Sequence, residues 1–112
     1  MQRFEIWLAD LPAFDNSHVQ HGYRPVVVVS NDSANKYSPI ITVVPLTSRT
    51  KKPLPTHVLL HWSDGCRTST ALCEQILTID KNRCRRCIGY LFDKADRAGI
   101  CRALTIQLDM AS

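Results

Sequence analysis

A polar segment, residues 13–23, brings together side chains that could move a proton and bind an anion. It holds His18 and His21, and an imidazole takes up and releases a proton near neutral pH. Arg24 follows directly, and its guanidinium is a permanent cation whose fork of donors fits a phosphate group. The segment is long for so short a chain, and long loops in compact domains are often functional. Solvated loops and structural ion pairs contain the same residue types, so these types alone leave both interpretations open.

Cysteines form the second group with possible chemistry. The motif Cys84-Arg-Arg-Cys87 has the spacing of half a zinc site, but the two arginines would repel a dication. The other three cysteines, Cys66, Cys73 and Cys101, form no second pair of this kind. An odd number of cysteines, five, without a signal peptide also argues against a disulfide framework. We therefore expect reduced cysteines, no metal and no cofactor.

Charge and hydropathy bound the class of partner. The net charge of +4 suits a polyanion, and Arg83, Arg85 and Arg86 form a basic cluster that either contacts nucleic acid or is a solvated face. No apolar run approaches the roughly 20 residues that span a bilayer, and the N-terminus lacks the apolar core of a signal peptide. We expect a cytoplasmic protein with no membrane contact.

Short apolar stretches predict the elements that must position these side chains. Alternating or β-branched residues predict strands over 4–11, 26–29, 40–46, 56–62, 69–76 and 88–91. Pro25 is expected at the start of the second strand, and Pro45 suggests an edge or a bulge in the third. Residues 47–55 are expected to form a basic loop, and a short basic helix or turn should follow Asp80.

Two helices are expected beside the strands. Residues 30–32 can cap a helical turn over 33–36, and Asp93 can cap a final helix with Asp96 in its first turn. The expected apolar face of that helix consists of Ala98, Cys101, Leu104 and Leu108, flanked by Ile100. Many short strands separated by turns predict one domain, residues 1–112, built as a small barrel with the helix over an open end or edge.

Five blocks, in order and covering nearly the whole chain, resemble the MazF/PemK/Kid toxin family. They are 5–11 (EIWLADL), 22–32 (GYRPVVVVSND), 44–48 (VPLTS), 54–58 (LPTHV) and 73–81 (CEQILTIDK). Each block is weak by itself, but five in register are specific. The resemblance implies a mainly β (α+β) fold, an SH3-like small β-barrel with short inserted helices and a C-terminal amphipathic helix, as in CcdB and MazF.

The resemblance also implies the toxin of a type II toxin–antitoxin system, a sequence-specific endoribonuclease that cuts single-stranded mRNA without a ribosome or a metal. The ribose 2′-OH would attack the adjacent phosphate, leaving a 2′,3′-cyclic phosphate and a 5′-OH. Such chemistry needs a proton acceptor for the 2′-OH, an acid for the leaving oxygen, and donors or cations for the phosphorane. DNA lacks the 2′-OH and cannot react in this way.

Four residues match catalytic positions of that family. Arg24 matches its catalytic arginine and Thr47 its active-site threonine, which would hydrogen-bond the phosphate or orient the nucleophile. His18 lies where the Kid branch carries a histidine and would shuttle a proton, and Glu74, at an acidic position, would act as a base or orient Arg24. RNA contacts are expected from their neighbours Gln20, His21, Tyr23, Ser48, Arg49 and Lys51.

Two departures from the family pattern keep other functions open. Val19 replaces a glutamate of many members, and Leu72 and Leu77 stand where members carry arginine. Arg49 or the cluster within 83–86 could supply the missing charge. The alternatives are a CcdB-like gyrase poison, which kills by binding a protein, and a catalytically impaired homologue that binds RNA or antitoxin.

Three partners follow from the resemblance and the composition. Single-stranded mRNA is the expected substrate, and an acidic, disordered antitoxin that folds on binding is the expected inhibitor. A second copy of the chain is the third, because so small a domain buries little surface by itself.

Overall fold

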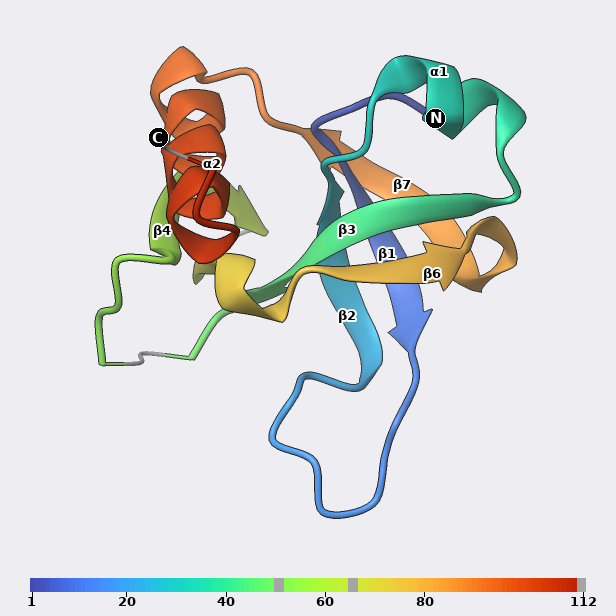
Figure 1. Cartoon of the computed structure of the whole chain (residues 1–112), viewed down its shortest axis with the longest axis horizontal. Helices are drawn as coiled ribbons and strands as arrows, with labels where there is room; N and C mark the ends of the chain where they lie inside the picture. The colour runs from blue at the N-terminus through green and yellow to red at the C-terminus, as the bar shows by residue number, and fades with distance from the viewer. Residues whose placement is uncertain (50–51, 65–66, 111–112) are drawn as a thin grey trace.

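Seven antiparallel strands make up the sheet of the computed structural model, which describes residues 1–49, 52–64 and 67–110, with the backbone alone at 63–64 and 67–68. They are β1 (Glu5–Leu11), β2 (Gly22–Val28), β3 (Ile40–Thr47), β4 (His57–Asp64), β5 (Arg67–Leu72), β6 (Leu77–Asp80) and β7 (Cys84–Tyr90) (Figure 1). The helical elements are α1 (Asp32–Tyr37), α2 (Lys94–Gln107) and two short 3-10 turns, η1 (Cys73–Gln75) and η2 (Lys81–Arg83). The mainly β fold expected from the sequence is therefore confirmed.

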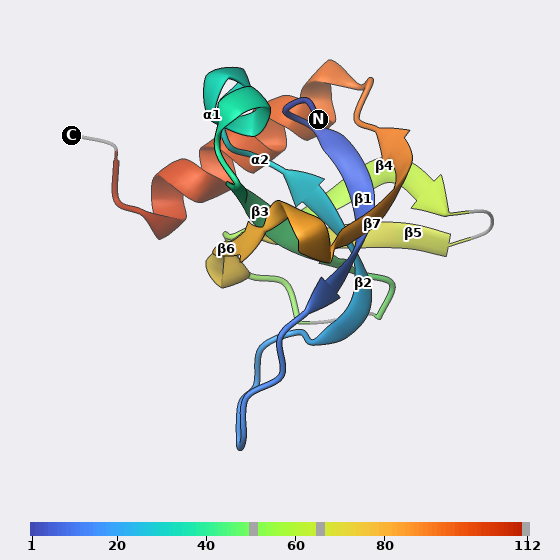
Figure 2. The same cartoon turned by 90° about the vertical axis from the view of Figure 1, so that its right-hand side faces the viewer.

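The strands lie in the order β4-β5-β3-β2-β1-β7, and β6 pairs with β3. One side of β3 pairs with β2, while its other side pairs first with β6 and then with β5. The loop between β1 and β2 extends away from the rest of the molecule, and α1 lies near the N-terminus (Figures 1 and 2). β3 is thus a central strand that joins every part of the sheet.

Each of two prolines, Pro25 in β2 and Pro45 in β3, directs its nitrogen to the side on which it has no ladder partner among the described residues. Val29 donates its N–H to the Thr42 carbonyl (2.9 Å), so odd-numbered residues of β2 direct their N–H toward β3, and those of β3 direct theirs away from β2. Pro25 therefore faces β3 just beyond the last pair, Val26 with Pro45, and Pro45 faces the gap between the β6 and β5 ladders. The expectation of an edge strand at Pro45 is wrong, and Pro25 lies inside β2 rather than at its start.

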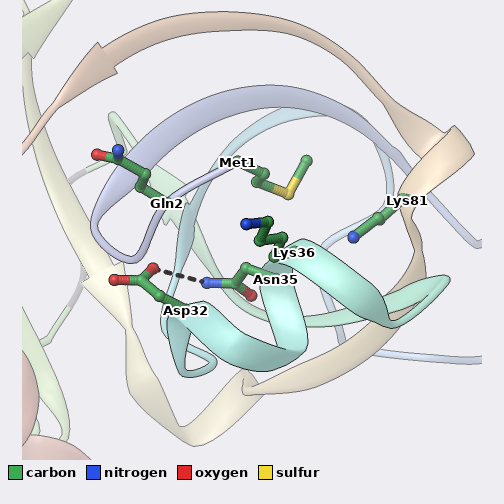
Figure 3. A pocket seen from close by; sticks show the side chains of 6 residues that line it. All are labelled: Met1, Gln2, Asp32, Asn35, Lys36 and Lys81. Atoms are coloured by element: carbon green, nitrogen blue, oxygen red, sulfur yellow. Dashed lines mark hydrogen bonds between the residues drawn. The ribbon is translucent and has the colours of Figure 1, made fainter.

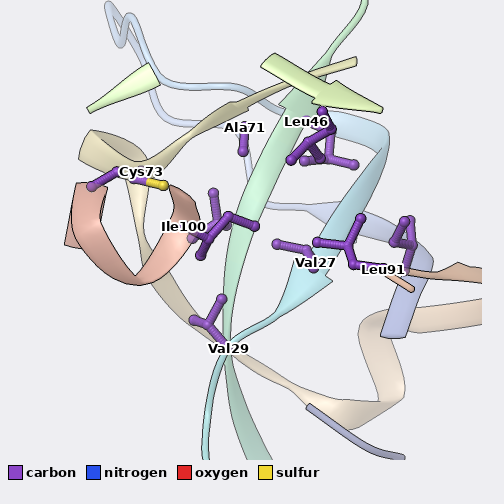
Figure 4. Packing of buried hydrophobic residues seen from close by; sticks show 11 residues of the cluster. Val27, Val29, Leu46, Ala71, Cys73, Leu91 and Ile100 are labelled. Atoms are coloured by element: carbon purple, nitrogen blue, oxygen red, sulfur yellow. The ribbon is translucent and has the colours of Figure 1, made fainter. Parts of the chain in front are cut away.

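Residues 26–29 are an unbroken apolar run because β2 is buried on both faces. Val27 and Val29 belong to one core cluster, and Val26 and Val28 belong to another. The first cluster fills the space between the sheet and α2, where Ile100 points from the helix toward Val27 (Figure 4). The second contains Ala9, Leu11, Ile41, Val43 and Ile79 besides the two valines.

The terminal helix α2 is capped as expected but packs by a different face. Asp93 accepts the Ala95 N–H (2.8 Å), whereas the buried residues of the helix are Asp96, Ile100 and Ala103. Ala98, Cys101 and Leu108 of the predicted face are exposed, and Leu104 is half-buried. The spacing of apolar residues could not predict this face, because one of its three buried residues is the acidic Asp96. No helix in the described part of the chain is long and apolar enough to cross a membrane.

Several strands also differ from the sequence-based expectation. The strand expected over 69–76 ends at Leu72 and gives way to η1, and β6 was not predicted. β7 begins at Cys84 rather than at 88, because its first half is polar and exposed and lacks an apolar pattern. The predicted turns are confirmed: Asn31 caps α1 by accepting the Ala34 N–H (2.9 Å), and η2 follows Asp80.

β4 and β7, the first and last strands of the ladder order, meet where the Trp62 side chain packs on Gly89. A Cβ on Gly89 of β7 would lie 2.4 Å from Nε1 of Trp62 on β4, a distance that no side chain tolerates. Trp62 and Ile88 both pack against the first core cluster. Glycine is therefore required at position 89, since the indole occupies the space of any larger residue.

His61 joins β4 to the start of α2 through two carboxylates. Its backbone N–H donates to Asp96 Oδ2 (2.9 Å), and its Nδ1 lies 2.6 Å from Asp96 Oδ1 and 3.2 Å from Asp93 Oδ2. The hydrogen bond to Asp96, followed by the charges of Asp96 and Asp93, raises the pKa of His61 above 6.5. Because Asp96 is buried, its charge depends on this contact.

The free energy of unfolding should therefore fall as the pH rises through the raised pKa of His61. A group whose folded pKa is raised stabilises the fold fully below its unfolded pKa, and this stabilisation is lost as it deprotonates in the folded state. Denaturant unfolding between about pH 5 and pH 9 would measure the step. His61→Gln should remove it, while His21→Gln, in an exposed loop, should keep it. An unchanged pH profile in His61→Gln would contradict this assignment.

Candidate active site

A cavity of about 290 Å³ opens where the ladder between β2 and β3 ends. Its lining residues come from five strands and the residue after β3, and they are Leu8, Tyr23, Arg24, Pro25, Leu46, Thr47, Ser48, Ser69, Arg86 and Ile88. Tyr23 to Pro25 and Leu46 to Ser48 both lie just beyond the terminal pair, Val26 with Pro45, at the same end of the ladder. The end of the ladder therefore places the two sequence-predicted residues Arg24 and Thr47 at one cavity.

The described residues that line this cavity include two guanidiniums and three aliphatic hydroxyls but no carboxylate. Arg24 and Arg86 supply the positive charge, and Thr47, Ser48 and Ser69 supply the hydroxyls. Cations and neutral donors without a competing acid suit a bound phosphate, because each donor can face a phosphate oxygen. The arrangement can bind an anion and stabilise charge that develops on it.

Local contacts orient the two residues predicted as catalytic. Arg24 lies opposite Ala9 of β1. It donates its Nε–H to the carbonyl of His21 (3.1 Å), and this hydrogen bond fixes the orientation of the guanidinium. Thr47 ends β3 opposite Thr70 and is 3% exposed. Its Oγ1 accepts the backbone N–H of Arg49 (3.2 Å), so the hydroxyl is fixed at the point where the chain leaves the strand.

The basic cluster of β7 is divided between two cavities. Leu8 pairs with Arg86 and Ala9 with Cys84, so Arg85 is an extra residue at an irregularity of the ladder. Arg86 lines the cavity of Arg24, whereas Arg85 lines another of about 480 Å³ with Asp10 and Arg83. Arg83 also donates to the Asp10 carbonyl (3.1 Å). Of the cluster expected to supply charge, Arg86 is the member that reaches the site.

A third cavity, of about 560 Å³, lies between the N-terminus and α1 (Figure 3). It is lined by Met1, Gln2, Asp32, Asn35, Lys36 and Lys81. Its lining contains none of the residues that the sequence analysis assigned to the site. The cavity of Arg24 and Thr47 is therefore the candidate active site, although it is the smallest of the three.

His18 and His21 are exposed on the loop of residues 12–21, and neither lines the cavity. Gln20, in the same loop, donates its backbone N–H to Oε1 of Gln75 (2.8 Å). Tyr23 follows the loop, lines the cavity and is 61% exposed. The polar segment thus meets the cavity at its C-terminal end, while His18 lies further along the loop.

Glu74 is not brought to Arg24, contrary to one of the roles considered for it. Its Oε2 lies 2.6 Å from Nε2 of His57, whose side chain is only 8% exposed. Glu74 Oε1 is buried and has no hydrogen-bond partner among the described residues. The carboxylate therefore joins η1 to β4 and lies outside the cavity lining.

The remaining predicted RNA contacts divide into three groups. Ser48 lines the cavity, Arg49 is exposed just beyond it, and Lys51 lies outside the described residues. Ser69 was not assigned to the site by sequence, and Arg86 was considered only as a member of the cluster within 83–86. Ser69 lies in β5 and is 5% exposed, and no sequence pattern distinguishes its hydroxyl from those of the threonines on either side of it.

Cys84 and Cys87, the pair with zinc-site spacing, have different surroundings. Cys84 packs against the second core cluster, and burial raises the pKa of its thiol. Cys87 is exposed, and its thiol donates to the Gly89 carbonyl (3.6 Å). Among the described residues, the group with metal-ligand spacing is His61, Asp93 and Asp96, and their hydrogen bonds account for its geometry.

Comparison with known proteins gives a family and several relatives. The family model described as "PemK-like, MazF-like toxin of type II toxin-antitoxin system" matches residues 2–108. A curated protein of Staphylococcus saprophyticus, endoribonuclease MazF, is 44% identical over 97 residues, which cover 84% of this chain and 80% of that protein.

Solved structures share the fold over nearly the full length. An endoribonuclease from a mycobacterial species, solved in complex with its cognate antitoxin, has a TM-score of 0.82 at 25% identity and covers 100% of this chain and 98% of its own. MazF from Deinococcus radiodurans has a TM-score of 0.80 at 24% identity, with coverage of 98% and 97%. At this identity the second likeness concerns the fold alone.

Proposed function

The chain belongs to the PemK-like, MazF-like toxins of type II toxin–antitoxin systems, and on this premise we propose that it is an endoribonuclease that cuts single-stranded mRNA at specific sequences, independently of the ribosome. The observation that carries the proposal is the cavity in which Arg24 and Thr47 meet Arg86. The staphylococcal relative is named an endoribonuclease. Incubation of RNA with the purified protein, followed by sequencing of the cut ends, tests activity and specificity together.

We propose that the two guanidiniums bind the scissile phosphate. The 2′-OH of the preceding ribose attacks phosphorus as it loses its proton, and the bond to the 5′-oxygen breaks as that oxygen gains one. The products are a 2′,3′-cyclic phosphate and a 5′-OH. Negative charge grows on the non-bridging oxygens of the phosphorane, where Arg24, Arg86 and the Thr47 hydroxyl stabilise it. Since the substrate supplies the nucleophile, no step requires a metal.

Proton transfer is assigned first to His18. Its loop ends at His21, whose carbonyl holds Arg24, so the loop and the cavity are directly connected. Imidazole can take the 2′-OH proton or return one to the leaving oxygen near neutral pH. Glu74 is the second candidate, but its carboxylate would first have to leave His57. Val19 at the usual acid position makes the histidine more important.

The sheet is proposed to close into an SH3-like barrel within a single domain over 1–112. The support is the contact between Trp62 of β4 and Gly89 of β7, the strands at the two ends of the ladder order. Such a contact closes the barrel by side-chain packing and leaves the strand edges there without mutual pairing. The site then lies at the mouth where five strands contribute residues.

An acidic antitoxin is proposed as the inhibitor. The mycobacterial relative was solved in complex with its cognate antitoxin. Here the positive cavity and the exposed Arg49 would attract an acidic peptide as they attract RNA.

An RNA cleavage assay separates the proposed activity from its alternatives. A gyrase poison would leave RNA intact, and an impaired homologue would bind RNA without cutting it.

Arg24→Ala and Arg86→Ala should each lower the rate of RNA cleavage by about a hundred- to a thousandfold, by analogy with the loss of one oxyanion donor. Thr47→Ala should lower it less, because a neutral hydroxyl stabilises charge less than a guanidinium. The matched control is Arg85→Ala, the adjacent arginine of β7 that lines another cavity. Equal losses in Arg85→Ala and Arg86→Ala would mean that the effect is one of net charge and not of the cavity.

His18→Ala should lower the cleavage rate and remove its dependence on pH near neutrality, because a titrating proton carrier is lost. Rates measured from about pH 5 to pH 8 cover the range in which an imidazole titrates. His18→Ala with the wild-type rate throughout would exclude histidine catalysis. Proton transfer would then have to come from Glu74 and Arg24.

A homodimer is expected in solution, because a second copy adds the buried area that a domain of this size lacks. Exposed apolar side chains such as Tyr37, Phe92 and Leu108 are available for such contacts. Sedimentation at micromolar concentration should give about twice the chain mass. A monomer under these conditions would contradict the expectation.

A further inference from the structure

Among the described residues, the loop of residues 12–21 makes one hydrogen bond to a residue distant in the sequence. Its other described bonds are local: Ser17 donates its N–H to the Phe14 carbonyl (3.2 Å), and Val19 donates its N–H to the Ser17 hydroxyl (3.2 Å). The long-range bond joins the Gln20 N–H to Oε1 of Gln75 (2.8 Å), 55 residues further along the chain. A loop that projects from the sheet, as this one does in Figures 1 and 2, thus has a tether near its end.

That tether is adjacent to the contact that orients Arg24. Gln20 is followed by His21, whose carbonyl accepts the Arg24 Nε–H (3.1 Å). Gly22 then has a φ of +75°, a left-handed conformation that lets the chain turn from the loop into β2. A shift of the backbone at Gln20 would therefore move the His21 carbonyl, with Gly22 as the point of rotation.

Gln75 itself is carried by a firmly held element. The preceding Cys73 is completely buried in the first core cluster and donates its N–H to the Thr56 carbonyl (3.0 Å). Glu74 contacts His57 at 2.6 Å. On the other side, Leu77 begins β6 and pairs with Val43 of β3. Two contacts and a strand thus fix the backbone from which the Gln75 side chain reaches the loop.

We propose that Gln75 is a positioning residue, which holds the loop of residues 12–21 through the Gln20 N–H and so keeps the His21 carbonyl where it orients Arg24. The inference rests on the proposed function for its effect on catalysis, while the tether is a property of the fold. Gln75 does not line the cavity and is not a catalytic residue. The contact between Glu74 and His57 then also has a role, because it helps to fix η1, the element that carries Gln75.

Gln75→Ala should therefore lower kcat by about two- to tenfold, the factor that one net hydrogen bond contributes to an equilibrium. KM should stay within about twofold, because Arg86 and the hydroxyls of the cavity still bind the phosphate while Arg24 loses only its orientation toward the developing charge. Hydrogen–deuterium exchange should become faster in a peptide covering residues 12–21 and remain unchanged in β6. A purely structural role would instead lower the melting temperature and accelerate exchange in η1 and β6 as well.

Conservative variants and a control sharpen the test. Gln75→Glu keeps an acceptor oxygen and should restore both loop protection and kcat, whereas Gln75→Met keeps the length of the side chain but lacks the oxygen and should behave like Gln75→Ala. The methionine variant also repeats the test if the alanine variant folds poorly. The matched control, Gln107→Ala, removes the same side chain from an exposed position at the end of α2 and should change neither quantity.

Unchanged exchange of the loop in Gln75→Ala and Gln75→Met would overturn the tether. Faster exchange with an unchanged kcat would overturn the positioning of Arg24. A wild-type protein that cleaves no RNA would overturn the proposed function, and this outcome is distinguishable because exchange of the loop measures the tether without substrate.

Discussion

The site exists where it does because a β-ladder must stop at a missing N–H. Pro25 faces β3 without a donor, so the pairing of β2 with β3 ends at Val26 and Pro45. The nitrogen of Pro45 faces the opposite edge of β3, between the residues that pair with β6 and those that pair with β5. No described residue is paired with Pro45 at that edge, so the missing N–H breaks no ladder hydrogen bond there. The residues just past this point line the cavity instead of continuing the sheet. Beyond this point β3 continues as Leu46 and Thr47, which pair with β5 and have no partner in β2 among the described residues.

A positive cavity follows from which strands meet at that end. β2 contributes Arg24 and β7 contributes Arg86, while the described lining residues from the other strands are apolar or carry hydroxyls. Two guanidiniums at one cavity without a neighbouring acid repel each other, so a bound phosphate lowers the electrostatic energy of the site. Acids nearby are engaged elsewhere: Asp10 with Arg83, and Glu74 with His57. Their absence from the lining is what keeps the cavity selective for anions.

The sequence predicted those features that local pattern decides. The apolar run 26–29 predicted a buried strand, and Asn31 and Asp93 predicted the starts of the two helices. The pattern failed where tertiary contacts decide: α2 packs on the face of Asp96, whose carboxylate is bound by the backbone N–H and the imidazole of His61, 35 residues away. β7 was missed at its start because an exposed strand needs no apolar alternation. Arg24 and Thr47 came from resemblance, whereas Ser69 and Arg86 require the strand register, and no spacing in the sequence reveals that Glu74 contacts His57.

The cavity holds side chains that can stabilise negative charge but lacks an imidazole or a carboxylate for proton transfer among its described lining residues, so the neighbouring loop is the place to look for one. Four strands and the residue after β3 hold the cations and hydroxyls, yet the cavity lining in the described residues contains neither an imidazole nor a carboxylate. In-line attack by a 2′-OH needs both proton steps near the phosphate. An imidazole or a carboxylate for these steps must come from outside the lining, and His18 lies on the loop that leads into Arg24. Because the same loop carries the carbonyl that orients Arg24, its position would govern both charge stabilisation and proton transfer in the proposed reaction. The contact of Gln20 with Gln75 is therefore placed where one hydrogen bond can influence both halves of the reaction.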